Sequence, residues 1–243
     1  RLVFTLAERA LAGVSPDTAL AYARWAAAGF GPELRPAGLL LSARTWRAAG
    51  RADSALWTYE RLIEEGSEDA DAVARARYER ARLLEDLGRW DQARGEYHAL
   101  ASAVLTHALA LESQVRLVRH YLAKGERELA LAEAGHALRA MEDLLAGQQD
   151  EGVQTRVGEA RALLLLETGD ARRGCGALAA MLKRYPDAPL DAALLARGGA
   201  AADGLGNTDL AVELYRAAEW RAGDAGLHDR VWRALERLGR MSR

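Results

Sequence analysis

The most constraining feature of this sequence is a glycine that follows one apolar, helix-forming run after another. It occurs at Gly13, Gly50, Gly88, Gly125, Gly169, Gly206 and Gly239. Successive members are 37, 38, 37, 44, 37 and 33 residues apart, and a recurrence of this length indicates a repeated supersecondary unit. Glycine ends a helix readily because it adopts the left-handed conformation without a steric penalty. The spacing therefore predicts a series of helical hairpins, each with its glycine in the turn.

Small residues stand at two fixed distances from these glycines. Seven residues before the glycine lie Ala43, Ala81, Val118, Ala162 and Gly199, and five residues after it lie Ala55, Ala93, Ala130, Gly174 and Ala211. Small side chains at both places allow the two helices of a hairpin to approach closely. Nine residues after the glycine there is usually a large residue, as at Tyr22, Tyr59, Tyr97, Leu178 and Tyr215, with Ala134 as the exception. We expect this large residue to fill the gap between successive hairpins.

This order of small residue, glycine, small residue and aromatic residue resembles the tetratricopeptide repeat. The resemblance covers nearly the whole chain, and Pro186 lies near the position of the proline that often closes a unit of that family. The chain departs from the family in its longer period, where about 34 residues is usual, in lacking a tryptophan near the start of the first helix, and in showing the closing proline clearly only once. The resemblance implies an all-α fold, a right-handed α-solenoid of about six helical hairpins with a C-terminal cap helix.

Three segments are expected along the chain. Residues 1–31 form a degenerate N-terminal hairpin, residues 32–223 form five tetratricopeptide-like hairpins, and residues 224–243 form a C-terminal capping helix. The 44-residue spacing after Gly125 adds about seven residues to one unit. These residues either lengthen its second helix, by about 10 Å at 1.5 Å per residue, or enlarge the polar loop GQQDEG at 147–152.

Composition and motifs exclude several classes of function. The net charge of −2 gives no bulk attraction to nucleic acid or to an anionic membrane, and no apolar run is long enough to span a bilayer. The sequence contains no G-x-S-x-G, no H-E-x-x-H and no P-loop. Its single cysteine, Cys175, is expected to be a buried structural thiol. We therefore expect a protein that is not an enzyme and that holds no cofactor and no metal.

In the tetratricopeptide family the first helix of each hairpin lines the concave face, and the resemblance thereby selects a candidate partner-binding groove. Counting back from the glycines gives Arg44, Arg47, Arg75, Tyr78, Arg82, Arg119, Arg156, Leu163 and Leu166. We hypothesise that this groove binds a protein or peptide partner with an acidic part and an apolar part, because guanidinium groups bind carboxylates through paired hydrogen bonds. The alternative is that these arginines pair with neighbouring acids or reflect the composition, in which Lys124 and Lys183 are the only lysines.

The main functional hypothesis is a non-enzymatic interaction scaffold or adaptor. The stretch LKRYPDAP at 182–189 is similar to the helix-to-proline junction of bacterial cell-envelope members of the family, which suggests a role in cell-envelope assembly. One alternative is the superhelical, non-catalytic domain of a larger enzyme such as a soluble lytic transglycosylase. A remote alternative is an RNA-binding helical repeat, which the net charge of −2 disfavours. Because the chain begins at Arg1, we expect a processed or trimmed product, either cytoplasmic or periplasmic after removal of a signal peptide.

Overall fold

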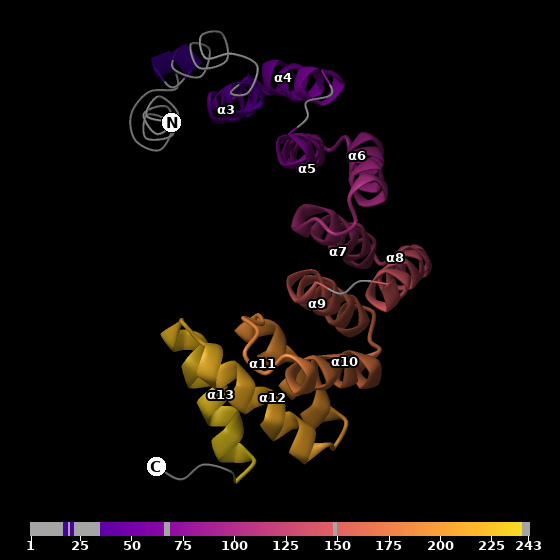
Figure 1. The fold of residues 1–243 in the computed structure, drawn as a ribbon, viewed down its shortest axis with the longest axis vertical. Coiled ribbons are helices and arrows are strands. Elements are labelled where there is room, and N and C mark those ends of the chain that lie inside the picture. The colour runs from indigo at the N-terminus through magenta and orange to yellow at the C-terminus, as the bar shows by residue number, and fades with distance from the viewer. Residues whose placement is uncertain (1–16, 19, 22–34, 66–68, 148–149, 240–243) are drawn as a thin grey trace. The chain divides into compact units, whose positions relative to one another are not determined.

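The computed structural model describes residues 17–18, 20–21, 35–65, 69–147 and 150–239 (Figure 1). Eleven helices, α3 to α13, follow one another in this part of the chain, and no strand occurs in it. The predicted N-terminal hairpin of residues 1–31, with its turn at Gly13, lies outside the described residues except for 17–18 and 20–21. The prediction of an all-α fold is confirmed for the part of the chain that the structure describes.

The helices pair into five hairpins, each with a first helix (A) and a second helix (B). The A helices are α3 (Arg35–Ala48), α5 (Ala70–Asp86), α7 (Ala108–Ala123), α9 (Glu151–Glu167) and α11 (Ala192–Gly204). The B helices are α4 (Ala52–Glu64), α6 (Trp90–Ala103), α8 (Arg127–Gly147), α10 (Ala171–Arg184) and α12 (Thr208–Arg221). Helix α13 (Ala225–Arg237) follows the fifth hairpin. The chain forms two compact units, residues 1–113 and residues 114–243.

The glycine turns have the conformation that the sequence predicted. Gly50, Gly88, Gly125, Gly169, Gly206 and Gly239 all have a positive φ, between +67° and +89°. Where the structure describes the residue after the glycine, this residue donates its backbone N–H to the carbonyl oxygen five residues earlier, as Arg51 does to Trp46 at 2.9 Å and Arg89 to Leu84 at 2.8 Å. This is the Schellman arrangement, which satisfies helix-terminal carbonyl groups and turns the chain into the next helix.

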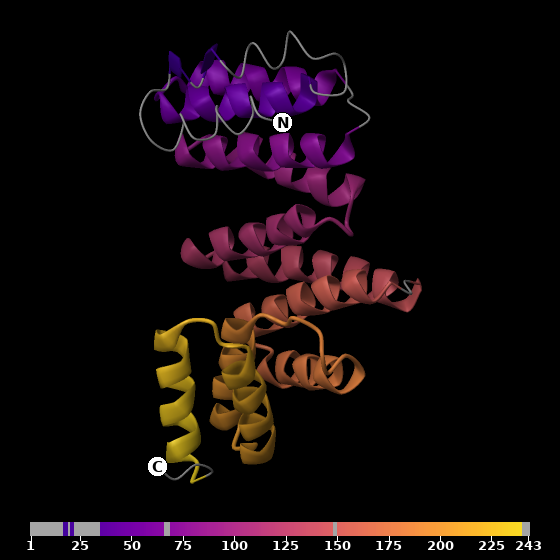
Figure 2. The same ribbon diagram turned by 60° about the vertical axis from the view of Figure 1, so that its left-hand side comes forward.

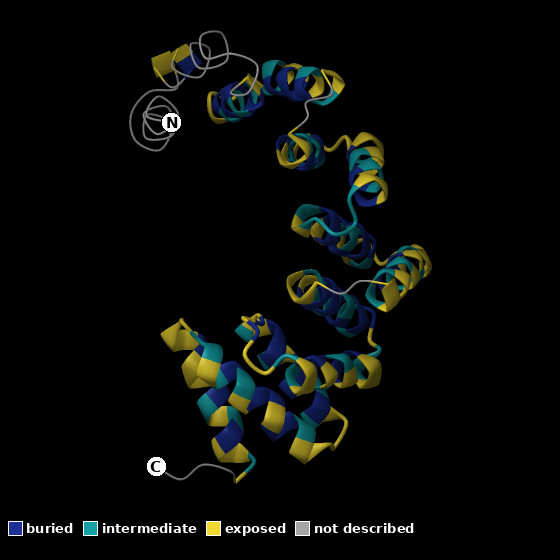
Figure 3. Cartoon of the chain, viewed as in Figure 1, coloured by how far each residue is buried: buried dark blue, intermediate teal, exposed yellow. Residues whose placement is uncertain are grey.

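The two helices of a hairpin meet at the predicted small residues. Ala43 and Ala55, for example, are completely buried in the first hairpin. Figure 3 shows buried residues on the helix faces that pack together within each unit. In the fifth hairpin, a Cβ atom on Gly199 would lie 2.8 Å from Cδ1 of Tyr215, so the absence of a side chain is required for the aromatic ring to fit. A small residue on the A helix thus receives the large residue of its own B helix.

The large residue of the B helix also reaches the next hairpin. In the first hairpin, the hydroxyl of Tyr59 on α4 donates a hydrogen bond of 2.9 Å to Oε2 of Glu79 on α5. The expectation that this residue fills the gap between successive hairpins is therefore confirmed at Tyr59. The contact of Tyr215 with Gly199 adds a packing role within the hairpin that the spacing alone did not indicate.

The extra residues after Gly125 lengthen a helix. Helix α8 contains 21 residues, whereas the other B helices contain 13 or 14. Of the two possibilities left open by the sequence, the extended helix is the observed one, since α8 continues to Gly147. The additional turns carry Leu145 to the region where α8 packs against α9.

Helix α13 packs against α12 and buries Val231 and Leu235 completely (Figure 2). Gly239, with a φ of +67°, repeats the hairpin turn after it. Seven residues before that glycine, however, stands Trp232, whose ring stacks on His228 with 6.3 Å between the ring centroids. The first helices of the five hairpins carry Ala43, Ala81, Val118, Ala162 and Gly199 at this position, so α13 differs from them by its large side chain.

We expect the substitution Gly199→Ala to lower the free energy of unfolding by about 1–3 kcal/mol, because the added methyl group would collide with the rigid ring of Tyr215. Gly204→Ala on the same helix is the matched control. A Cβ at Gly204 meets nothing within 4 Å, and the change should leave stability equal or raise it by up to about 1 kcal/mol. Urea unfolding followed by circular dichroism measures both; equal losses would contradict the close crossing.

Candidate partner-binding face

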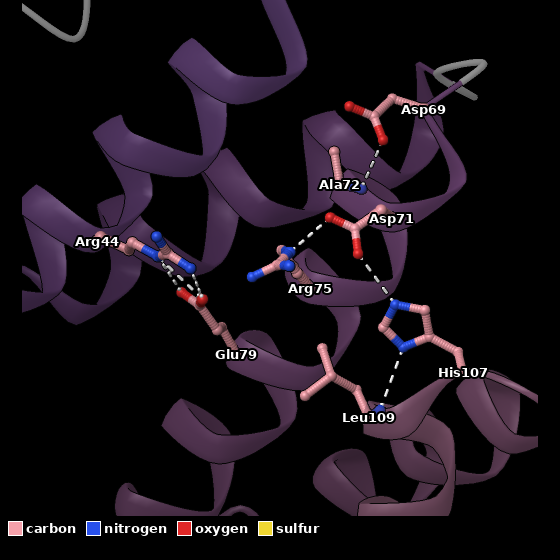
Figure 4. A network of polar contacts seen from close by, with 8 residues as sticks. All are labelled: Arg44, Asp69, Asp71, Ala72, Arg75, Glu79, His107 and Leu109. Carbon is pink, nitrogen blue, oxygen red and sulfur yellow. Dashed lines mark hydrogen bonds and ion pairs between the residues drawn. The ribbon is translucent and has the colours of Figure 1, made fainter. Parts of the chain in front are cut away.

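In the unit of residues 1–113, the carboxylate of Glu79 joins three helices, and Figure 4 shows its contact with Arg44. Arg44 on α3 donates from Nε to both oxygens of Glu79, at 2.9 and 3.0 Å, and its Nη2 also donates to Oε1. The hydroxyl of Tyr59 on α4 donates to the same group. Burial of the Tyr59 phenol, together with the adjacent carboxylate, raises its pKa far above the usual value, so the hydroxyl remains a donor.

A second ion pair joins the same two A helices nearer their C-terminal ends. Nη2 of Arg47 on α3 donates to Oδ2 of Asp86 on α5 at 2.6 Å. The Arg44–Glu79 pair spans 35 residues of sequence and the Arg47–Asp86 pair spans 39, which is about one repeat in each case. These two arginines, predicted to line the groove, therefore tie one repeat to the next. This is the alternative that the sequence left open for them.

Asp71, in the first turn of α5, gathers two further side chains (Figure 4). It accepts a hydrogen bond of 2.6 Å from Nε of Arg75 and lies 3.1 Å from Nε2 of His107. Because the backbone N–H of Leu109 donates to Nδ1 of His107 at 3.2 Å, the ring proton belongs on Nε2, which donates to Asp71. The hydrogen bond from Arg75, followed by that from His107, lowers the pKa of Asp71. The network thereby orders the starts of α5 and α7.

Tyr78 and Arg82 continue this face of α5. Tyr78 is buried, its hydroxyl donates to Oε1 of Glu112 on α7, and its ring centroid lies 6.1 Å from that of Tyr97. Arg82 is half-buried, and no acid of the described residues pairs with it. Of the groove residues predicted in this unit, Arg82 is thus the one cation whose guanidinium is not bound to a carboxylate among the residues described.

In the unit of residues 114–243, Glu167 on α9 connects three A helices. Its Oε1 accepts hydrogen bonds from Nε and Nη2 of Arg119 on α7, at 3.0 and 2.8 Å, and from Nη2 of Arg197 on α11 at 3.1 Å. Burial acts to raise the pKa of Glu167, but the hydrogen bonds and charges of Arg119 and Arg197 outweigh it and lower the pKa overall. Arg119, like Arg44, is bound to an acid of the following repeat.

The remaining predicted residues lie on α9. Arg156 is exposed and has no ion-pair partner within the described part of the chain. Leu163 and Leu166 are half-buried and pack against the core of their unit. A Cβ on Gly174 would come within 2.9 Å of Cδ2 of Leu166, so this leucine fills space that the glycine leaves open in the hairpin.

Three acids that bind predicted arginines across repeats are residues that the sequence analysis missed. They are Glu79, Asp86 and Glu167. Each lies on the next A helix, 35 to 48 residues after its arginine. A search for acids at one repeat length beyond each predicted arginine would have found them, because stacked A helices present equivalent positions to one another.

Other chemically reactive groups occupy structural positions. The thiol of Cys175 is buried and donates to the backbone oxygen of Gly198 at 3.2 Å, and burial raises its pKa. The prediction of a buried thiol is thus confirmed. No group of three His, Cys, Asp or Glu side chains is placed to hold a metal ion in the described ranges. None of the helices described is both long and apolar enough to cross a membrane.

Solved structures with a similar arrangement of helices identify the fold. A thermophilic tetratricopeptide repeat protein from Thermus thermophilus aligns with 83% of this chain and 99% of its own, with a TM-score of 0.52 and 21% identity. BtubC (BKLC) from P. vanneervenii aligns with 95% of this chain and 92% of its own, with a TM-score of 0.56 and 16% identity. No family model and no curated protein matches the sequence. The chain has the tetratricopeptide-repeat fold, as its residue spacing predicted.

A double-mutant cycle measures the link between repeats. We expect Arg44→Gln and Glu79→Gln to show a coupling free energy of about 1–2 kcal/mol, because Glu79 is only 18% exposed and Arg44 binds both of its oxygens. The matched control is Arg75→Gln with Asp71→Asn, an exposed pair on one helix, with an expected coupling of about 0.5 kcal/mol or less. Equal couplings in urea unfolding experiments would contradict a special role for Glu79.

The pH dependence of stability should distinguish two carboxyl groups of α9. The pKa of Glu167 is lowered in the fold, so its charged form stabilises the protein above the unfolded pKa of about 4.3, and this contribution is lost as the pH falls through the lower folded pKa. Glu167→Gln should therefore lower the free energy of unfolding near pH 7, and the difference from wild type should shrink on acidification.

Glu159 provides the control of opposite sign. Its burial, together with the charge of Asp191, raises its pKa, although the backbone N–H of Asp191 acts to lower it. The fold therefore favours the neutral form of Glu159, and its contribution to stability declines as the pH rises from the unfolded pKa through the raised folded one. Glu159→Gln should be at least as stable as wild type near pH 7. A loss of stability at pH 7 equal to that of Glu167→Gln would refute this assignment.

Proposed function

We propose that this chain is a non-enzymatic interaction scaffold whose A helices bind a segment of a partner protein or peptide. The observation that carries the proposal is Arg82 of α5, a half-buried cation without an acidic partner among the described residues, beside arginines that are paired. Such a guanidinium can receive a carboxylate through two parallel N–H donors. Partial burial makes the interaction stronger than it would be on an open surface.

The face of α5 presents a row of suitable groups. Arg75, Tyr78 and Arg82 stand at i, i+3 and i+7, which places them on one side of the helix. We propose that a partner carboxylate binds at Arg82 and that a second acidic residue approaches Arg75, whose partner Asp71 is exposed and lies one turn away. Arg44 and Arg47 then contribute mainly to repeat packing, because Glu79 and Asp86 already bind them.

A separate candidate contact surface lies on α9, within the unit of residues 114–243. Leu163 and Leu166 are half-buried there, and Arg156 lies seven residues before Leu163 on the same side of the helix. This face by itself offers apolar carbon next to one exposed guanidinium. Such a surface suits a segment in which apolar residues adjoin an acid.

The stretch LKRYPDAP, which suggested a role in the bacterial cell envelope, has a packing explanation. Arg221 on α12 donates to the backbone oxygen of Ala188 at 3.2 Å and also to that of Pro186. These contacts close the connection between α10 and α11. The proposal is therefore partner binding, with cell-envelope assembly as one setting in which such binding could be used.

Affinity capture from native lysate tests the proposal when it compares wild type with Arg82→Glu and with Arg94→Glu. Arg94, 45% exposed on the B helix α6, is the matched control for charge reversal away from the A helices. Reversal at Arg44 or Arg119 is less informative, because a new carboxylate would face Glu79 or Glu167 and disturb the packing. We expect a partner that wild type and Arg94→Glu retain and that Arg82→Glu loses, while all three keep the same helical circular dichroism.

Retention of the same partner by all three proteins would show that the α5 face is not the binding surface. Mass spectrometry of the captured protein then gives its sequence, and a synthetic peptide from it can be titrated against each variant. We expect the peptide to bind Arg82→Glu at least about tenfold more weakly than wild type, because the variant loses a bidentate contact.

A further inference from the structure

A small apolar pocket lies in the unit of residues 114–243, between the end of α8 and the helices α9 and α10. Its volume is about 210 Å³. Leu145, Gly158, Met181 and Tyr185 are among the residues that line it. Pockets for whole small molecules usually measure about 300–1,000 Å³, so this one is of a size for a single side chain.

The pocket exists because α8 is longer than the other B helices. Leu145 belongs to the last turn of a helix of 21 residues, and B helices of the usual 13 or 14 residues would end well before it. The insertion after Gly125 therefore contributes Leu145 to the lining of this cavity. The 44-residue spacing after Gly125, which the A-helix face does not explain, is thus accounted for by the longer helix that lines this pocket.

The lining of the pocket is adaptable at Met181. A Cβ on Gly158 would lie 2.6 Å from Sδ of Met181, so the glycine on α9 leaves room for the thioether of α10. Methionine has a flexible, unbranched side chain that adjusts to apolar groups of different shapes. Met181 can therefore fit its terminal methyl group to an incoming side chain.

The charges at the pocket are all of one sign. Arg161 and Arg184 are the charged side chains that line it, and no acid does. Nη2 of Arg161 donates to Glu142 at 3.0 Å, whereas its Nε is buried and has no hydrogen-bond partner. The guanidinium of Arg184 lies over the ring of Tyr185, 5.2 Å from its centroid, and has no acidic partner in the ranges described. Because Arg161 already binds Glu142, the guanidinium of Arg184 is the one available to a carboxylate beside the apolar lining.

We infer that this pocket binds a partner segment that presents one branched apolar side chain directly beside a carboxylate. The apolar side chain contacts the lining formed by Leu145, Met181 and Tyr185, and the carboxylate pairs with Arg184. The carboxylate can belong to an aspartate or glutamate or to a chain terminus, since both offer the same two oxygens. The inference rests on the proposed scaffold function and adds to it a second contact site with its own chemistry.

Methionine methyl NMR of the full chain tests this directly, because the sequence has only three methionines and Met181 lines the pocket. The probes are acetyl-Gly-Asp-Leu-Asp-Gly-amide, the same peptide with Asn for both Asp, the same peptide with Ala for Leu, and acetyl-Gly-Gly-Leu with a free carboxylate. We expect a saturable shift of the Met181 methyl signal with the first or the fourth peptide. The Asn and Ala peptides should bind at least about fivefold more weakly. Met141, which does not line the pocket, should shift less than Met181.

Variants separate the pocket from general binding. Arg184→Gln should weaken the carboxylate-bearing peptides by about fivefold and leave the Asn peptide unchanged. The matched control Arg172→Gln, an exposed arginine of the same helix that does not line the pocket, should have no effect. Ala180→Leu adds a side chain to the pocket wall and should reduce binding of every leucine peptide.

No shift at Met181 with any peptide, or an equal shift with the Asp and Asn peptides, would overturn the inference. Binding of only the internal or only the terminal carboxylate supports it and identifies the source. The proposed scaffold function is tested independently by the Arg82-dependent capture. If Arg82-dependent capture succeeds but no peptide shifts the Met181 signal, only the pocket inference is refuted. If a peptide shifts the Met181 signal but no Arg82-dependent partner is captured, only the proposal for the A-helix face is refuted.

Discussion

The close crossing of two helices at small residues is the contact on which this structure depends. Each hairpin can form because residues such as Ala43 and Ala55 bring no bulk to the crossing. Where the crossing residue is Gly199, the ring of Tyr215 takes the place of a side chain, so that the interface remains filled. The turn glycines serve a different purpose, since they provide the left-handed conformation that lets the B helix fold back on the A helix.

Successive hairpins are joined by carboxylates that bind arginines of the neighbouring A helices. Glu79 receives Arg44 and Tyr59, and Glu167 receives Arg119 and Arg197. A carboxylate in this position satisfies several donors at once and is partly shielded from water, so each link is stronger than an isolated surface pair. The same links bind most of the arginines that would otherwise give the A-helix face a positive charge.

We therefore propose that partners bind at arginines that no acid of the described residues already binds. Arg82 lies among paired arginines without an acid of its own in the described residues, and the guanidinium of Arg184 lies over the ring of Tyr185. The two positions arise in different ways: Arg82 belongs to the regular repeat, whereas the pocket beside Arg184 depends on the extension of α8. In a fold built from equivalent units, an irregular unit can supply a surface that the others lack.

The sequence by itself determined the fold class, the hairpin turns and the helix crossings, because each depends on residues within one repeat: a glycine with a positive φ, as at Gly88, and small residues at fixed distances from it. The partners of the arginines were decided only by the tertiary structure. Arg44 meets Glu79 because stacking places equivalent positions of two repeats side by side, and a reading within one repeat cannot see a contact 35 residues away. The pocket at Met181 is likewise formed where α8, α9 and α10 meet. The 44-residue spacing indicated that this repeat is irregular, but the cavity itself depends on how the three helices pack.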